Sequence, residues 1–202
     1  MSAQPKHKMT VEEYLAFEET SDVKHEYYAG EIFAQAGANE RHNIIVGSVL
    51  ALLYGQLRRQ PCNVYPSDMR VEIQDTGLYT YPDISVVCGQ ALFAETSRST
   101  LINPTVIIEV LSPSTEAYDR GKKFQNYRTI ETLQEYVLIT QDFKQIEHYV
   151  RQPDDLWLLS FAGDESDIVT LPSIDCTLSI ADVYEKVIFE ASEAEEPLRS
   201  LE

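Results

Sequence analysis

Two acidic residues stand in apolar stretches of the sequence that have the pattern of β-strands. Asp83 precedes one apolar run, and Glu109 lies inside another, at positions 105–111. Because successive side chains of a strand alternate between its faces, Glu109 shares a face with Ile107 and Leu111. Two carboxylates on neighbouring strands would repel each other, and a hard divalent cation with oxygen ligands relieves that repulsion. The pair therefore predicts a site for Mg²⁺, or for Mn²⁺ in its place.

A helical pattern follows the second acidic stretch and adds a basic group. Asp119, Lys123 and Tyr127 are spaced at i, i+4 and i+8, so they lie on one face of a helix. A lysine there can position or deprotonate a water molecule and stabilise developing negative charge. The same spacing also fits a surface ion pair between Asp119 and Lys123, worth about 0.3–0.5 kcal/mol, with Tyr127 in the core.

The elements that must position these residues follow from capping, turn and periodicity signals. A capping box at Thr10 predicts a short helix, and Ala29-Gly30 joins two strand patterns into a tight hairpin. The full set comprises the hairpin of 25–28 with 31–34, a helix over 39–59, strands at 69–73, 78–88, 105–111 and 135–140, a helix over 114–130, and a hairpin of 145–150 with 156–161. This order predicts an α/β fold, with a mixed α+β sheet and helices on its faces.

The chain of 202 residues is acidic, with 33 Asp and Glu against 16 Lys and Arg and a formal net charge of −17. Its length and 44% hydrophobic content predict one domain over residues 1–189, followed by an acidic, frayed tail at 190–202. The net charge disfavours non-specific adhesion to nucleic acid, because that binding draws on phosphate neutralisation by Lys and Arg. It leaves room for a local basic patch.

Several classes of protein are disfavoured by patterns that the sequence lacks. The longest apolar run, at 44–54, is far shorter than the roughly 20 residues of a membrane-spanning helix, and the N-terminus is polar, so we expect no membrane contact and a cytoplasmic protein. Cys62, Cys88 and Cys176 have no C-x-x-C spacing, which predicts buried thiols and argues against a disulfide framework. The histidines form no pair at metal-binding spacing, and we interpret His42 as a surface residue.

Four motifs together resemble a known bacterial family. In order and spacing, Y-P-D-I-S-V-V, I-I-E-V-L-S-P-S-T, D-R-G-K-K-F-Q-N-Y and Q-E-Y-V-L-I are similar to the restriction-endonuclease-like family of the PD-(D/E)XK nuclease superfamily. The resemblance includes the hairpin motif E-Y-Y-A-G-E and spans the chain from position 9 to position 187. It implies a four-stranded mixed core sheet with flanking helices and an added N-terminal hairpin. It also implies Mg²⁺-dependent hydrolysis of phosphodiester bonds in DNA, and a homodimer.

Carried over position by position, the resemblance assigns metal ligands. Asp83 and Glu109 match the two metal-binding acids of the family, and the main-chain carbonyl of Val110 would be a further ligand. Glu26, in the hairpin motif, resembles an extra acid that related nucleases bring to the metal.

The resemblance departs from the superfamily at its lysine. The lysine that usually stands two positions after the second acid is Leu111 here. Lys123 on the following helix resembles its replacement, with Lys122 as the alternative and Tyr127 as a further candidate. This departure keeps a second hypothesis open beside a metal-dependent endonuclease, namely a non-catalytic interaction protein that retains the nuclease fold. A third is a glycosidase, in which two carboxylates act without a metal.

The tyrosine content bears on assembly. The chain has 12 tyrosines, among them Tyr27, Tyr28, Tyr79 and Tyr81 near the expected hairpins. Exposed aromatic residues favour interfaces, so we expect a homodimer.

Overall fold

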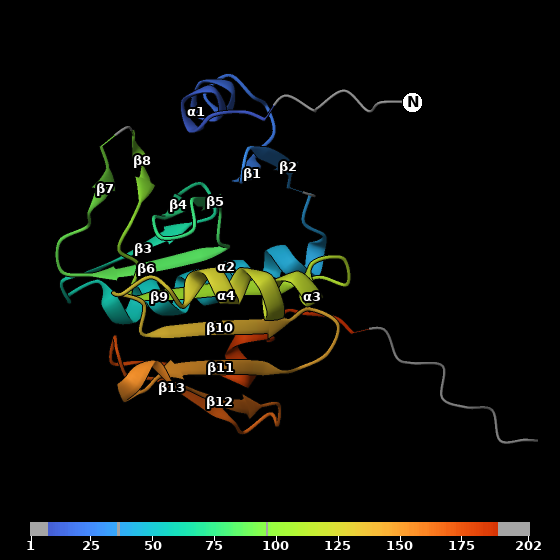
Figure 1. The fold of residues 1–202 in the computed structure, drawn as a ribbon. Helices are drawn as coiled ribbons and strands as arrows, with labels where there is room; N and C mark the ends of the chain where they lie inside the picture. Colours follow the sequence, from blue (N-terminus) through green and yellow to red (C-terminus); the bar gives the residue numbers. More distant parts are fainter. Residues whose placement is uncertain (1–7, 36, 96, 190–202) are drawn as a thin grey trace, which may run out of the picture.

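The core sheet takes its strands from the most apolar runs of the sequence. The computed structural model describes residues 8–35, 37–95 and 97–189. The strand order of the core sheet is β12-β11-β10-β9-β6-β3, in which β9 and β10 run parallel and all other neighbours are antiparallel (Figure 1). Its strands are β3 (Cys62–Pro66), β6 (Ile84–Cys88), β9 (Val106–Leu111), β10 (Glu135–Thr140), β11 (Ile146–Arg151) and β12 (Trp157–Ala162). Every residue of β9 and β10 is buried, and the predicted strands at 105–111 and 135–140 are confirmed.

Helix α2 (Glu40–Leu57) covers one face of the core sheet and confirms the helix predicted over 39–59. It begins where the side chain of Asn39 accepts a hydrogen bond of 2.9 Å from the main-chain N–H of His42, which caps the first turn. Its apolar face, which includes Val49, lies in one buried cluster with Ile84 of β6 and Ile108 of β9. The sheet and this helix together fix the position of the first turn of α2.

Three short helical segments lie over the other face of the core sheet. They are α3 (Glu116–Tyr118), the π-helical turn η1 (Asp119–Lys123) and α4 (Phe124–Tyr127). They follow one another without a break, so the helix predicted over 114–130 is confirmed over 116–127, but it is shorter at both ends and has a π-helical turn in its middle. Gly121 lies in the irregular turn, and glycine weakens a regular helix by about 1 kcal/mol relative to alanine. π-Helical turns occur often at functional sites.

A second sheet stands above the core sheet and carries the N-terminal hairpin. Its strand order is β2-β1-β5-β4-β8-β7. Helix α1 (Val11–Glu18) precedes it and begins at the predicted capping box of Thr10 and Glu13. The hairpin is confirmed, because Ala29 and Gly30 both adopt positive φ, as its two-residue turn requires. The strands are β1 (His25–Tyr28), β2 (Glu31–Ala34), β4 (Arg70–Ile73), β5 (Leu78–Thr80), β7 (Phe93–Ala94) and β8 (Ser97–Leu101).

The strand predicted over 78–88 is in fact two strands in two sheets. Strand β5 belongs to the upper sheet and β6 to the core sheet, and the residues Tyr81, Pro82 and Asp83 join them. Pro82 has no N–H to donate to a strand neighbour, so the ladder stops there. Asp83 consequently lies at the joint between the sheets.

Several elements were not predicted, and the core sheet has six strands where the family resemblance implied four. The additional elements are β3, β7, β8, the two-stranded sheet of β13 (Ile168–Leu171) and β14 (Cys176–Ser179), and the short helix α5 (Ile180–Val183). The predicted hairpin of 145–150 with 156–161 is confirmed as β11 and β12, with a 3₁₀ turn η2 (Pro153–Asp155) between them. The tail predicted over 190–202 lies outside the described residues.

The tyrosines on which the expected homodimer rested are mostly internal. Tyr27, Tyr79 and Tyr81 are buried, and Tyr27 and Tyr79 pack around the fully buried ring of Tyr14. That part of the argument was wrong, and the homodimer stays a prediction. Within the described residues no helix is both long and apolar enough to cross a membrane.

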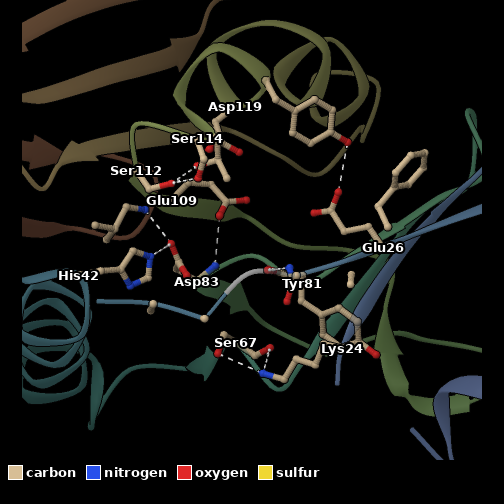
Figure 2. A pocket seen from close by; sticks show the side chains of 18 of the residues that line it. Lys24, Glu26, His42, Ser67, Tyr81, Asp83, Glu109, Ser112, Ser114 and Asp119 are labelled. Atoms are coloured by element: carbon tan, nitrogen blue, oxygen red, sulfur yellow. Dashed lines mark hydrogen bonds and ion pairs between the residues drawn. The ribbon is translucent and has the colours of Figure 1, made fainter. Parts of the chain in front are cut away.

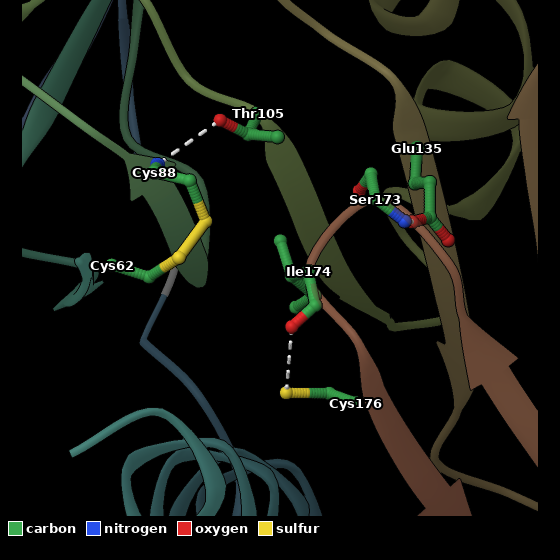
Figure 3. Close-up of a disulfide and its surroundings, with 7 residues drawn as sticks. All are labelled: Cys62, Cys88, Thr105, Glu135, Ser173, Ile174 and Cys176. Atoms are coloured by element: carbon green, nitrogen blue, oxygen red, sulfur yellow. Dashed lines mark hydrogen bonds between the residues drawn. A yellow bond between two sulfur atoms is a disulfide. The ribbon is translucent and has the colours of Figure 1, made fainter. Parts of the chain in front are cut away.

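The expectation of three free thiols was also wrong. Cys62 and Cys88 form a disulfide, because the antiparallel register of β3 and β6 places them directly opposite each other (Figure 3). The sequence gives no sign of that register, since the two residues are 26 positions apart. Cys176 is a buried thiol, as predicted, and burial raises its pKa.

Reduction of this disulfide should lower the stability of the fold. A cross-link that closes a loop of 26 residues restricts the unfolded chain, and the chain-entropy model gives about 3.5 kcal/mol for it. We expect urea unfolding with dithiothreitol to show a free energy of unfolding lower by roughly that amount. The Cys62→Ser, Cys88→Ser double variant should have the same free energy of unfolding as the reduced protein, and dithiothreitol should not change it. A native protein whose midpoint is unchanged by dithiothreitol would contradict the cross-link.

Candidate active site

A cleft of about 1260 Å³ opens between the upper sheet and the core sheet. The β1–β2 hairpin, the first turn of α2 and the loop that follows β9 contribute its walls (Figure 2). Its lining includes the sequence candidates Glu26, Asp83, Glu109, Val110, Lys122 and Lys123. The structure thus brings residues from four separate stretches of the chain to one place.

Asp83 and Glu109 lie side by side, Asp83 directly before β6 begins and Glu109 near the end of β9. The main-chain N–H of Asp83 donates to Oε2 of Glu109 at 3.3 Å, and Oδ2 of Asp83 accepts from the main-chain N–H of Val110 at 2.7 Å. The antiparallel pairing of β6 with β9, which matches Ile84 to Ile108, sets this arrangement. The expectation that the two acids occupy neighbouring strands agrees with the geometry.

The continuous helical segment formed by α3, η1 and α4 places the side chains of Lys123 and Tyr127 against the carboxylate of Glu109. Lys123 Nζ lies 2.8 Å from Oε1 of Glu109, and the Tyr127 hydroxyl donates to the same oxygen at 2.8 Å. Glu109 faces this segment together with Ile107 and Leu111, as strand alternation predicted. Lys123 is only 5% exposed, so its ion pairs lie inside the protein and are not those of a solvated helix surface.

Two further acids complete the surroundings of Lys123. Its Nζ lies 3.2 Å from Oε1 of Glu26 and 3.4 Å from Oδ1 of Asp119. Glu26 also accepts hydrogen bonds from the hydroxyls of Thr80 and Tyr118. We call Glu26, Glu109, Asp119 and Lys123 the acidic cluster; it holds three carboxyl groups around one ammonium.

Burial and charge shift the pKa values of this cluster in different directions. Burial raises the pKa of Glu109 to about 8 and raises that of Asp119, while the nearby ammonium of Lys123 opposes both shifts. Burial works against the charge of Lys123, but Glu109 and the other acids keep its pKa well above the usual value. For Glu26, Lys123 and Thr80 outweigh burial and lower the pKa. With all three acids ionised and Lys123 protonated, the cluster would carry a net charge of −2, which favours proton uptake or cation binding.

The donor atoms at this place fit a hard divalent cation. Carboxylate oxygens and main-chain carbonyls are the ligands that Mg²⁺ prefers, and Asp83, Glu109 and Val110 offer both kinds. Among the described residues, no three or more His, Cys, Asp or Glu side chains form a group suited to a metal ion. A cation here would consequently need the main-chain carbonyl or water in addition to the two carboxylates.

The structure separates the two candidate lysines. Lys123 is enclosed by the acidic cluster, whereas Lys122 is exposed at the cleft, with its Nζ 4.5 Å from the ring centre of Tyr28. Leu111, which replaces the usual lysine, is buried in the apolar cluster beneath the helical segment. The amine that reaches Glu109 thus comes from the helical segment.

His42 was interpreted as a surface histidine, and this interpretation was wrong. Its Nε2 lies 3.1 Å from Oδ2 of Asp83, and its side chain is only 14% exposed. Its Nδ1 is buried and has no hydrogen-bond partner in the described part of the chain. The sequence around His42 shows where α2 begins, through the capping residue Asn39. It does not show that this end of the helix lies beside Asp83, because that depends on how α2 packs on the core sheet.

Comparisons with known proteins agree with this architecture. The model of the Uma2 family, described as "Putative restriction endonuclease", matches residues 11–181. Two proteins of Synechocystis sp., slr1290 and sll1609, both described as uncharacterized, are 36% identical over 182 residues and 38% identical over 161 residues. The first alignment covers 90% of this chain and 94% of the relative, and the second covers 79% and 91%.

A solved structure shares the fold. The crystal structure of a putative nuclease belonging to DUF820 from Anabaena variabilis superposes with a TM-score of 0.74 at 21% identity, over 89% of this chain and 99% of that one. The fold is therefore the restriction-endonuclease-like α/β fold that the motifs implied. With its family model spanning most of the sequence, the chain belongs to the Uma2 family of restriction-endonuclease-like proteins.

Proposed function

We propose that the protein is a Mg²⁺-dependent endonuclease that hydrolyses phosphodiester bonds of DNA. The observation that carries the proposal is the meeting of Asp83 and Glu109, with the ammonium of Lys123 2.8 Å from Glu109. Two strand-borne carboxylates and an adjacent amine are the groups that metal-assisted phosphodiester hydrolysis requires. Family membership supports the nuclease assignment, and the metal and the substrate are our inference.

The residues of the site divide the work of hydrolysis. In the reaction a water oxygen bonds to phosphorus, the opposite P–O bond breaks, and the leaving oxygen takes a proton. Mg²⁺, held by Asp83, Glu109 and the Val110 carbonyl, would supply a water molecule of lowered pKa and neutralise charge on the phosphate. Lys123 stabilises the negative charge that develops on the phosphate oxygens. His42 and the Val110 N–H fix one oxygen of Asp83 in place.

Calorimetric titration with MgCl₂ or MnCl₂ tests the proposal before any substrate is known. We expect the native protein to bind one cation, and Asp83→Ala and Glu109→Ala each to abolish the binding heat. Glu131→Ala, which removes an exposed acid, is the matched control and should bind as the native protein does. Binding that both site variants retain would refute a shared cation site.

A non-catalytic interaction protein is the second candidate. It is favoured by the net charge of −17 and by Leu111 at the usual lysine position. It predicts that neither Mg²⁺ nor Mn²⁺ binds, and that DNA and RNA of any form survive incubation with the protein. The calorimetric titration therefore separates the two candidates.

His42 should contribute to cation affinity through Asp83. Removing a hydrogen bond that orients a metal-binding carboxylate typically costs about 10–100-fold in affinity. We expect His42→Ala to weaken Mg²⁺ binding about tenfold by calorimetry. His42→Gln, which keeps an N–H donor near the position of Nε2, should lose less than about threefold. Equal losses in both variants would show that the N–H donor is unimportant.

A further inference from the structure

The β1–β2 hairpin presents aromatic side chains to the cleft beside the acidic cluster. In this hairpin Phe33 is the direct cross-strand partner of Glu26, so the two side chains share a face. Tyr28 is two positions from Glu26 in the same strand and faces the same way. Tyr27 and Ile32 point to the opposite face, where they pack with Tyr14.

Phe33 places an apolar aromatic ring in the lining of a cleft whose neighbouring groups are carboxylates. Its side chain lines the cleft and is 51% exposed, and its partner Glu26 lies 3.2 Å from Lys123. A half-exposed benzene ring adjacent to carboxylates gains little from burial, but it offers a flat apolar face next to the place where a phosphate would bind. Tyr28 lies beside it, packs partly against the apolar cluster of the core sheet, and holds the ammonium of Lys122 over its ring at 4.5 Å.

The basic residues of the cleft are too few to hold a duplex by its phosphates. Duplex binding draws on many Lys and Arg contacts. Lys24 forms an ion pair with Asp68 at 2.6 Å, and the three acids of the acidic cluster offset the charge of Lys123. Among the described lysines and arginines that line the cleft, only Lys122 has no acidic partner at ion-pair distance. Affinity must therefore come largely from another source.

Stacking of bases on aromatic rings supplies affinity without many phosphate contacts, at about 5–150-fold per base. Bases within a duplex are stacked on one another, so only an unpaired strand can use the rings. We propose that the site acts on single-stranded DNA, with a base stacked on Phe33 and a phosphate bound by Lys122. This inference rests on the proposed function and specifies its substrate.

Fluorescence anisotropy with labelled DNA tests the inference apart from turnover. The probes are a mixed-sequence 12-nucleotide strand and the same strand annealed to its complement, with Ca²⁺ replacing Mg²⁺ as the oxygen-binding cation. We expect the single strand to bind at least about tenfold more tightly than the duplex. Phe33→Ala should weaken single-strand binding about tenfold, and Phe33→Trp should restore it. Cleavage of both probes is then measured in Mg²⁺.

Phe161 provides a matched control for Phe33. It also lies on the edge strand of its sheet, faces a glutamate across the strand pair, and is 61% exposed, but it is outside the cleft. Phe161→Ala should bind the single strand as the native protein does. A change of sedimentation coefficient in Phe33→Ala, with DNA binding intact, would assign the ring to contact between copies and overturn the inference.

The remaining outcomes separate this inference from the proposed function. Equal or tighter binding and cleavage of the duplex, indifferent to Phe33→Ala, would refute the single-strand inference and leave the nuclease standing. If DNA stays intact in Mg²⁺ but the protein prefers single strands in a Phe33-dependent way, hydrolysis is refuted. Single-stranded DNA is then supported as the molecule that the cleft binds.

Discussion

Lys123→Met is expected to lower the free energy of unfolding by about 3–5 kcal/mol at neutral pH in the absence of divalent cations. The ammonium is buried among Glu109, Glu26 and Asp119, at 2.8, 3.2 and 3.4 Å. Removing it leaves buried carboxyl groups that must either hold a proton or remain charged without a partner. The measurement is urea unfolding followed by circular dichroism.

Lys122→Met is the matched control for this variant. It makes the same substitution at the neighbouring residue, whose side chain is exposed, and should change stability by less than about 0.5 kcal/mol. Adding Mg²⁺ should restore part of the loss in Lys123→Met, because a ligand that binds only the folded state stabilises it. Equal stability of the two variants would mean that Lys123 does not hold the cluster together.

The stability deficit of Lys123→Met should also depend on pH. A buried acid whose folded pKa is raised destabilises the fold once the pH exceeds its unfolded value, which is 4.5 for glutamate. Loss of the ammonium raises the folded pKa of Glu109 and Asp119 further, since Lys123 is the group that opposes their shifts. The deficit should therefore grow as the pH rises above 4.5 and shrink as it falls toward that value.

Glu109→Gln is expected to reduce Mg²⁺-dependent cleavage of DNA by about 10³-fold or more. Glutamine has the same shape, and its oxygen can still accept from Tyr127 and Lys123, so the variant should fold. What it loses is the charge that binds the cation. The measurement is the initial rate of cleavage of a labelled oligonucleotide at saturating Mg²⁺, compared with the native rate.

Glu147→Gln controls for the loss of a buried carboxylate. Glu147 is 5% exposed and pairs with Arg120 at 2.8 Å, outside the cleft lining. This variant should keep the native rate even if its stability falls. A Glu109→Gln rate within tenfold of native would remove Glu109 from the mechanism and favour the non-catalytic hypothesis.

The sequence predicted those parts of the fold that depend on local signals. The turn at Ala29-Gly30, the capping box at Thr10 and the apolar run of β9 each specify their element within a few residues, and all three elements are present. The polar strand β8, with residues Ser97–Leu101, has no such signal; it is held in the upper sheet by pairing with β4 and with the two-residue strand β7. Elements that owe their existence to distant partners were missed.

The same distinction holds for the candidate site. Asp83, Glu109 and Lys123 were chosen as candidates because acids in apolar strands and a helix-spaced lysine are visible in the sequence, and the structure brings the three together. His42 was misread because its contact with Asp83 depends on how α2 crosses the sheet. The disulfide of Cys62 with Cys88 was missed for a similar reason, since register decides it. Residue type suggests the chemistry, and tertiary placement selects the participants.

The joint between the two sheets has a mechanical consequence. The chain passes from β5 into β6 through Tyr81, Pro82 and Asp83, and at that joint Asp83 carries the hydrogen bonds to Val110 and His42. Proteins open locally in contiguous cooperative units. The upper sheet cannot swing away from the core sheet without pulling on Asp83. When the contacts of Asp83 with Val110 and His42 break, amide hydrogens of β1 and β5 should consequently exchange with solvent at the same rate as those contacts open. Opening of the cleft and loss of the site are then the same local unfolding step.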